Sequence, residues 1–285
     1  MSSQTASFEE IRVVARSAPA KNPAIQQQVQ ARLEHLALVE GQLGELASLS
    51  AWVAEGQRTA VPCIRHPRLA LFAATHGRAA ELPEGAPEAV RRQIARLIDG
   101  NGIAHRLSEA ADADFRLYEM GLDLPCADSR RGPAMNEPEA ARAVAYGMMA
   151  VEPGVDLLIV AALGIGADLA AGEVERALDE EAADPLAVLA AKGGPDIAAM
   201  LGAILAARLA GVPVMLDGSA ALAAAALAAR LIAGVGDHCR AATPRSGSSL
   251  GGGFEIPHIL SFSIDPPLAG LAAVPLAKTA TLLLA

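Results

Sequence analysis

The sequence predicts an α/β protein, a parallel sheet flanked by helices. Short apolar runs that end in glycine, threonine or aspartate alternate with segments whose apolar residues recur every three to four positions. This alternation favours parallel strands, because a parallel pair needs a helical crossover between its members. At 285 residues, 52% of them hydrophobic, the chain is long enough to bury both faces of a sheet.

The expected elements follow in chain order. Apolar residues at helical spacing predict a helix over residues 22–38 and, after Gly41, a second over residues 43–53. No strand pattern precedes these two helices. Four apolar runs then predict strands at residues 67–74, 115–119, 156–162 and 212–216. Helical spacing predicts three further helices over residues 87–98, about 140–151 and 219–233. Two more helices are expected to begin near residue 168 and within residues 192–196.

A ligand site is expected at one edge of the predicted sheet. Ligands of parallel α/β sheets bind outside the carboxyl ends of the strands. The turns that follow Ala74, Ala162 and Leu216 therefore mark the place where functional side chains should gather.

Composition and charge exclude several classes of function. The formal net charge is −9 and no lysine–arginine cluster occurs, which argues against a nucleic-acid partner. No apolar run approaches the roughly 20 residues of a membrane span. The three cysteines are far apart and the six histidines lack metal-ligand spacing, so neither a disulfide framework nor a metal site is expected. We expect a reduced, cytoplasmic protein without a cofactor.

Individual motifs leave alternatives open. The turn Gly164-Ile-Gly166 could place a phosphate at a helix N-terminus, but the third glycine of a dinucleotide fingerprint falls at Leu169. An ordinary strand–helix turn is favoured. Ser246–Gly253 could form a backbone nest for phosphate, and a flexible surface loop is favoured instead. A lone histidine such as His76 at a strand end is more often structural than catalytic.

Seven segments, taken in order, share their letters with one enzyme family. For example, Leu71–Gly77 resembles the family's F-A-A-D-H-G and Pro213–Gly218 its P-V-x-x-D-G. The other five are Gly41–Leu46, Gly132–Met135, Ala161–Gly166, Lys192–Met200 and Gly270–Leu276. Their order and spacing across about residues 20–278 resemble the nicotinate mononucleotide:5,6-dimethylbenzimidazole phosphoribosyltransferases of cobalamin biosynthesis.

The resemblance implies a Rossmann-like parallel sheet and a pentosyltransferase activity on a small-molecule nucleotide and an aromatic base. It also implies a homodimer, and a heterodimer with an intact family member is the alternative. We expect a small helical subdomain from residues 1–55 and 266–285, and an α/β core from 56–265. Carried over by position, the nucleotide-binding residues are Gly164, Gly166, Gly193, Gly194 and Ser246. The base pocket would contain Thr75 and His76.

The departures from the family fall where its chemistry should be. The family's general base is the glutamate of G-E-G-(T/S)-G, and Pro266 stands in its place. Asp265 is the only nearby candidate to accept the proton, as a weak substitute. A second family glutamate is replaced by Ala162, Asp168 stands where a nucleotide-binding threonine is expected, and the 173–192 segment is short.

Two hypotheses follow from these departures. The first is a phosphoribosyltransferase with impaired or altered activity. The second is a non-catalytic paralogue that binds a nucleotide or a corrinoid-pathway ligand, or that partners an active family member as a subunit.

Overall fold

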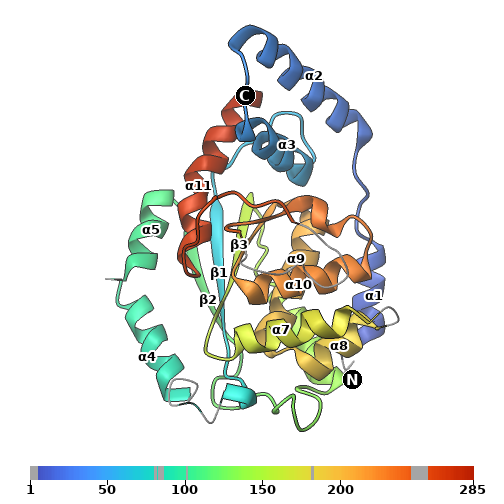
Figure 1. Ribbon diagram of the computed structural model, residues 1–285, viewed down its shortest axis with the longest axis vertical. Helices are drawn as coiled ribbons and strands as arrows, with labels where there is room; N and C mark the ends of the chain where they lie inside the picture. The colour runs from blue at the N-terminus through green and yellow to red at the C-terminus, as the bar shows by residue number, and fades with distance from the viewer. Residues whose placement is uncertain (1–5, 80–81, 83–86, 101, 181–182, 245–255) are drawn as a thin grey trace.

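The protein is built on a five-stranded, all-parallel sheet. The computed structural model describes residues 6–79, 82, 87–100, 102–180, 183–244 and 256–285. The strands lie in the order β2-β1-β3-β4-β5 (Figure 1). They are β1 (Pro67–Ala73), β2 (Asp114–Glu119), β3 (Leu157–Leu163), β4 (Val214–Asp217) and β5 (Cys239–Ala241). This architecture confirms the parallel α/β fold predicted from the sequence.

The helices occur where the apolar spacing predicts them, with additions. The long helices are α1 (Phe8–Arg16), α2 (Pro23–Glu40), α3 (Glu45–Gln57), α4 (Pro87–Ile98), α5 (Ile103–Ala111), α6 (Glu137–Met148), α7 (Ala167–Leu178), α8 (Pro185–Lys192), α9 (Pro195–Ala210), α10 (Ser219–Leu231) and α11 (Leu268–Thr281). Short 3-10 turns occupy η1 (Gly77–Ala79), η3 (Val235–His238) and η4 (Leu282–Leu284). The helices α1, α5 and α8 and the three-residue β5 were not predicted from the sequence.

The central strands bury both faces. Leu69 and Leu71 of β1 point to one side, where they pack with residues of α3, α5 and α11. Ala70 and Phe72 point to the other side, against α6 to α10. Every residue of β1 is buried, which explains why residues 69–73 are a continuous apolar run rather than an alternating one.

Two glycines bring α6 and α9 into close contact beneath the sheet. A Cβ atom on Gly147 of α6 would lie 1.8 Å from the carbonyl oxygen of Ala199 in α9. A Cβ atom on Gly202 of α9 would lie 1.9 Å from the carbonyl oxygen of Val144 in α6. Because neither glycine has a side chain, the backbones of α6 and α9 lie in direct contact. Any residue with a Cβ atom at either position would force the two helices apart.

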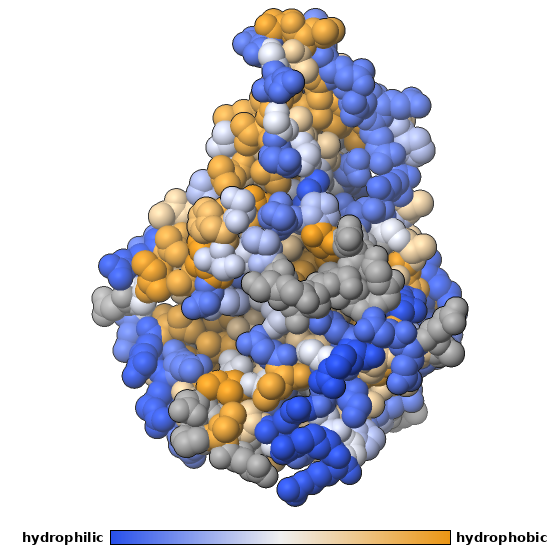
Figure 2. Space-filling view, viewed as in Figure 1, coloured by the Kyte–Doolittle hydropathy of each residue, from blue (hydrophilic) through white to orange (hydrophobic). Residues whose placement is uncertain are grey.

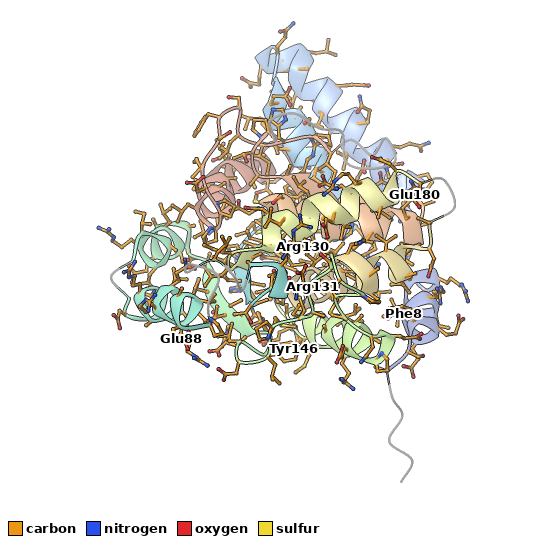
Figure 3. All side chains as sticks on the ribbon, turned by 60° about the horizontal axis from the view of Figure 1, so that its bottom comes forward. Phe8, Glu88, Arg130, Arg131, Tyr146 and Glu180 are labelled. Atoms are coloured by element: carbon orange, nitrogen blue, oxygen red, sulfur yellow. The ribbon has the colours of Figure 1, made fainter. Side chains whose placement is uncertain are left out.

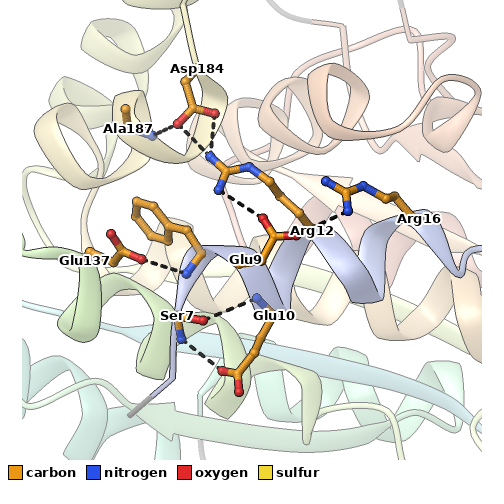
Figure 4. A network of polar contacts seen from close by, with 9 residues as sticks. Ser7, Glu9, Glu10, Arg12, Arg16, Glu137, Asp184 and Ala187 are labelled. Atoms are coloured by element: carbon orange, nitrogen blue, oxygen red, sulfur yellow. Dashed lines mark hydrogen bonds and ion pairs between the residues drawn. The ribbon is translucent and has the colours of Figure 1, made fainter.

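Polar contacts, drawn in Figure 4, bind helix α1 to α6 and α8. Ser7 and Glu10 form a capping box at its start. The backbone N–H of Phe8 donates to Glu137 of α6 over 3.0 Å, and Arg12 donates to both oxygens of Asp184 at the start of α8. The helix thus packs on α6 and α8.

A projection lies at the end of the sheet opposite to η1. It consists of α2, α3 and the C-terminal end of the chain, with Val29, Leu33, Ala54 and Leu284 forming its own small core. Apolar surface covers its tip in Figure 2. Leu38 and Val39 near the end of α2 are 87% and 65% exposed. The division of the chain at residues 55 and 266 stays a prediction.

Candidate active site

A cavity of about 220 Å³ opens at the carboxyl ends of β3 and β4. Ala162 to Ile165 contribute the turn after β3, and Asp217 to Ala220 contribute the end of β4 and the start of α10. The rest of the wall comes from Gln93 of α4, Ala167 and Asp168 of α7, and Pro266. The cavity therefore lies where the sequence places a ligand site, outside the strand ends.

Asp217 is the buried carboxylate of this cavity. The side chain is 1% exposed at the last position of β4. Its Oδ2 atom accepts a hydrogen bond of 2.7 Å from the backbone N–H of Gly270, whereas Oδ1 has no partner among the described residues. Burial raises the pKa of Asp217 to about 6, although the N–H groups of Gly270 and Ala269 act in the opposite direction.

Asp217 also supplies the cap that α11 lacks. The N-cap residue of α11 is Pro267, which makes no side-chain capping bond. The first N–H groups of a helix have no partner inside it. The carboxylate of β4 satisfies one of them and places its negative charge at the positive end of the helix.

Asp168 is the second acidic group that lines the cavity. It lies in the first turn of α7, and the hydroxyl of Ser219 at the start of α10 donates a hydrogen bond to it. This contact joins the N-termini of two neighbouring helices.

Pro266 forms the outer wall above the end of β4. A Cβ atom on Gly218 would lie 2.7 Å from Pro266 Cγ, and Gly218 has a φ of +94°, so glycine is required there on both counts. Pro266 itself is exposed and carries no ionisable group. Asp265 is also exposed, does not line the cavity, and uses its carbonyl oxygen to accept the N–H of Leu268.

The glycines that were predicted to bind nucleotide have packing roles as well. Gly164 lines the cavity with a φ of +131°, and a Cβ atom there would lie 2.2 Å from the carbonyl oxygen of Ala74. Gly166 and Gly194 lie against His76. A Cβ atom added to Gly166 would lie 2.7 Å from the His76 side chain, and one added to Gly194 would lie 2.3 Å from it. Gly193 ends α8 and does not line the cavity.

The remaining predicted site residues lie away from the cavity wall. Thr75 is buried, and its hydroxyl donates to the carbonyl oxygen of Leu122 over 2.9 Å. His76 is buried and its Nε2 atom lies 3.0 Å from Asp196 Oδ2 of α9. Burial opposes a charge on His76, but Asp196 outweighs it and raises the pKa of His76 to about 10. Ser246 lies outside the described residues.

A polar cluster surrounds Ser129 in the loop between β2 and α6, with partners from η1, α7 and α8. Arg78 pairs with Glu173, Ser129 donates to the same carboxylate, and Lys192 donates to the carbonyl oxygen of Ser129 over 3.1 Å. Figure 3, which brings the η1 end of the molecule forward, shows Arg130 and Arg131 near the centre of this face. Both guanidinium groups pair with the Asp128 carboxylate of the same loop, Arg130 over 2.7 Å and Arg131 over 3.7 Å.

Sequence reasoning did not assign roles to Asp217, to the Asp168–Ser219 contact or to this cluster. The strand end Asp217-Gly218 was recognisable as a turn, and its aspartate was the available signal. Among the described residues, no group of three or more histidine, cysteine, aspartate or glutamate side chains is arranged to hold a metal ion. None of the helices in the described part of the chain has the length and apolar character to cross a membrane.

Comparison with known proteins identifies the family. A family model described as phosphoribosyltransferase matches residues 18–178 and 172–248. A nicotinate-nucleotide–dimethylbenzimidazole phosphoribosyltransferase of Methylocella silvestris is 32% identical over 276 residues, covering 85% of this chain and 81% of the relative. The protein of that name from Ruegeria sp. is 35% identical over 224 residues, 67% of each chain.

Solved structures share the fold. The crystal structure of the Thermus thermophilus protein of that name matches with a TM-score of 0.79 at 23% identity, covering 92% of this chain and 96% of that one. The shared architecture agrees with the sequence relationships. The chain therefore belongs to the nicotinate-nucleotide–dimethylbenzimidazole phosphoribosyltransferase family.

Proposed function

We propose that this protein binds a small-molecule ligand of the family reaction, nicotinate mononucleotide or an aromatic base, and transfers the phosphoribosyl group far more slowly than its relatives. One observation carries the proposal: Pro266, without an ionisable group, forms the cavity wall where the resemblance places the general base. The cavity at the strand ends supports retained binding.

The chemistry explains why this replacement matters. A ring nitrogen of the base attacks C1′ of the ribose, the new N–C1′ bond forms, and the bond from C1′ to nicotinate breaks with its electron pair. The proton on the other ring nitrogen must pass to an acceptor. A positioned general base contributes roughly 10²- to 10⁴-fold to such a step. We therefore expect transfer to be slower by a factor of that order.

Asp217 would carry any residual transfer. Asp168 already accepts a hydrogen bond from Ser219, whereas the Oδ1 atom of Asp217 has no partner among the described residues. Its raised pKa of about 6 suits a group that accepts a proton near neutral pH. Its Oδ2 atom remains engaged with Gly270, so the carboxylate would have one free oxygen for this role.

The test is a calorimetric titration with nicotinate mononucleotide and then with dimethylbenzimidazole, with product formation followed in the same samples. The Methylocella silvestris relative is assayed in parallel. We expect binding of at least one ligand and turnover at least about 100-fold below the relative. Asp217→Asn should abolish residual turnover, while Asp99→Asn, which changes an exposed carboxylate outside the cavity, is the control and should leave turnover unchanged. Turnover equal to the relative would overturn the impaired-activity proposal, and no binding of either ligand would overturn the binding proposal.

We also propose that the chain is a cytoplasmic homodimer. The exposed apolar side chains of the projection, including Leu38, Val39 and Leu282, support an interface there, since such side chains gain free energy by leaving water. Light scattering after size-exclusion chromatography should give twice the monomer mass of 29.1 kDa. A monomer that forms a complex only when mixed with an intact family member would favour the heterodimer instead.

A further inference from the structure

Two helices begin at the wall of the cavity without a side-chain cap. The N-cap residues are Gly166 for α7 and Gly218 for α10, and neither makes a side-chain hydrogen bond. The two helices lie side by side (Figure 1), and the first turn of each contributes to the wall. The first N–H groups of a helix lack partners within it and carry partial positive charge. A pair of such helix ends therefore favours an anion.

Asp168 supplies an anion to both helix ends. It is the second residue of α7, and the hydroxyl of Ser219, the first residue of α10, donates to its Oδ1 atom. A carboxylate in the first turn of a helix is favoured by the helix dipole. Because this carboxylate is part of the chain, it is present at the two helix ends whether or not a ligand is bound.

The charges of the wall disfavour a second anion. The ionisable side chains among the described wall residues are Asp168 and Asp217, and none of these residues is lysine, arginine or histidine. A phosphate group carries a charge of about −1.5 to −2 at neutral pH. Placed at the start of α7, a phosphate would compete with Asp168 for the same N–H groups and would be repelled by its carboxylate.

Asp217 indicates what the cavity accepts instead. Its side chain is 1% exposed, and its Oδ1 atom has no hydrogen-bond partner among the described residues. A buried acceptor without a partner costs free energy, which a ligand recovers by donating a hydrogen bond to it. The N–H group of an uncharged heterocycle is such a donor, whereas the ionised oxygens of a phosphate can only accept.

We propose that Asp168 is a specificity-determining residue. Its carboxylate takes the place of a ligand phosphate at the starts of α7 and α10, so the cavity selects an uncharged heterocycle with an N–H group over a nucleotide. This inference rests on the proposed function and names which of its two ligands the cavity prefers.

The role of Asp168 is separable from that of Pro266. Asp168 weakens the binding of the phosphorylated donor and so raises its KM. Pro266 removes a proton acceptor and so lowers kcat. Slow transfer therefore has two independent causes in this chain.

Calorimetric titration of the full-length protein at pH 7 tests the role of Asp168. The ligands are nicotinate mononucleotide, the nucleoside that lacks its phosphate, and dimethylbenzimidazole. The parent should bind dimethylbenzimidazole more tightly than the nucleotide. Asp168→Asn keeps an oxygen that accepts from Ser219 but removes the charge, so its affinity for the nucleotide should rise at least about 10-fold. Its affinities for the nucleoside and the base should change by less than about twofold.

Asp99→Asn is the matched control. Asp99 is exposed and does not line the cavity, so this variant removes the same charge elsewhere. It should leave all three affinities unchanged. Asp168→Thr, a second variant without the carboxylate, should give the same gain for the nucleotide. The gain should shrink in about 0.5 M sodium chloride, because salt screens exposed charges.

A methylated base tests the role of Asp217. The N-methyl derivative of dimethylbenzimidazole lacks the N–H group, so the parent should bind it at least about 5-fold more weakly than dimethylbenzimidazole. In Asp217→Ala the two bases should bind alike, because the acceptor is gone. Equal affinities for the two bases in the parent would show that Asp217 is not the acceptor.

The outcomes distinguish this inference from the function on which it rests. If Asp168→Asn binds the nucleotide no more tightly than the parent, or if the nucleoside gains as much, the role of Asp168 is wrong and the proposed function stands. A parent that binds the nucleotide more tightly than the base would also overturn the selectivity alone. Binding of neither the base nor the nucleotide would overturn both proposals.

Discussion

The Asp217 carboxylate at the end of β4 accepts the backbone N–H of Gly270, in the first turn of α11, over 2.7 Å. This bond joins the end of a central strand to the helix that follows Pro266-Pro267. It compensates for the missing N-cap side chain of α11, but it leaves a nearly unexposed carboxylate with one unpartnered oxygen among the described residues. The same residue thus stabilises the helix through a hydrogen bond and destabilises the fold through its buried charge.

Asp217→Asn and Asp217→Ala separate these two effects. The folded pKa of about 6 exceeds the unfolded value of 3.8, so the native state binds the extra proton and stability falls as pH rises through this window. Asn keeps an oxygen acceptor without the charge and should raise stability at pH 7 by on the order of 2 kcal/mol. Ala should lower it by about 1 kcal/mol relative to Asn. Urea unfolding at pH 4 and pH 7 measures both, and equal stabilities of the Asn variant and the parent at pH 7 would contradict the assignment.

The His76–Asp196 pair should make the protein less stable in alkali. The folded pKa of His76, about 10, lies above its ordinary value of 6.5. Its contribution is therefore complete below about pH 6.5 and is lost as pH rises toward 10. Asp196→Asn should cost about 3 kcal/mol at pH 7, because it leaves a buried cationic group without its partner. Thermal unfolding between pH 7 and pH 10 should show a smaller alkaline loss in this variant than in the parent.

The close crossing of α6 and α9 should not tolerate a methyl group. Gly147→Ala and Gly202→Ala each place a Cβ atom within 2 Å of a carbonyl oxygen in the other helix, so the helices must separate. Each should destabilise the protein by about 1 to 3 kcal/mol. Gly172→Ala in α7 is the matched control, since nothing lies within 4 Å of its added Cβ. It should stabilise by about 0.5 to 1 kcal/mol, and losses of similar size in all three would argue against the steric explanation.

We expect Arg68 to stabilise the amino end of the sheet, because its guanidinium group bonds three acceptors at once. The group donates to Asp114 over 2.9 Å, to Glu152 over 3.0 Å and to the carbonyl oxygen of Ala150 over 3.2 Å. Lysine cannot reproduce this fork, so Arg68→Lys should lose most of the stability that Arg68→Ala loses, about 2 kcal/mol.

The dependence of stability on acid pH tests the role of Arg68 independently. Arg68 lowers the pKa of Glu152, and it acts with Arg116 to lower that of Asp114. The stabilisation by these depressed carboxylates is present above their ordinary pKa values and is lost as pH falls. The Arg68 variants should therefore show a shallower loss of stability in acid than the parent, as followed by urea midpoints from pH 7 to pH 3.

The sequence by itself determined the fold class, and it predicted the edge of the sheet at which the cavity lies. The strands β1 and β3 and the helix α4 are recognisable because buried parallel strands are continuous apolar runs and amphipathic helices repeat every 3.6 residues. Strand ends marked by Thr75-His76-Gly77 and Asp217-Gly218 indicated the edge where ligands bind. Family motifs added the expectation that Pro266 stands where a general base belongs.

Only the tertiary structure decided which side chains meet. Strand β5 is three residues long, too short for a periodic pattern, and exists because β4 offers it a pairing edge. Asp217 and Gly270 are 53 residues apart, and His76 and Asp196 are 120 residues apart. Local sequence patterns report spacing along a strand or helix, whereas these pairs arise because parallel strands bring distant turns to one edge of the sheet. The buried charge of Asp217 and the buried His76–Asp196 pair follow from that convergence.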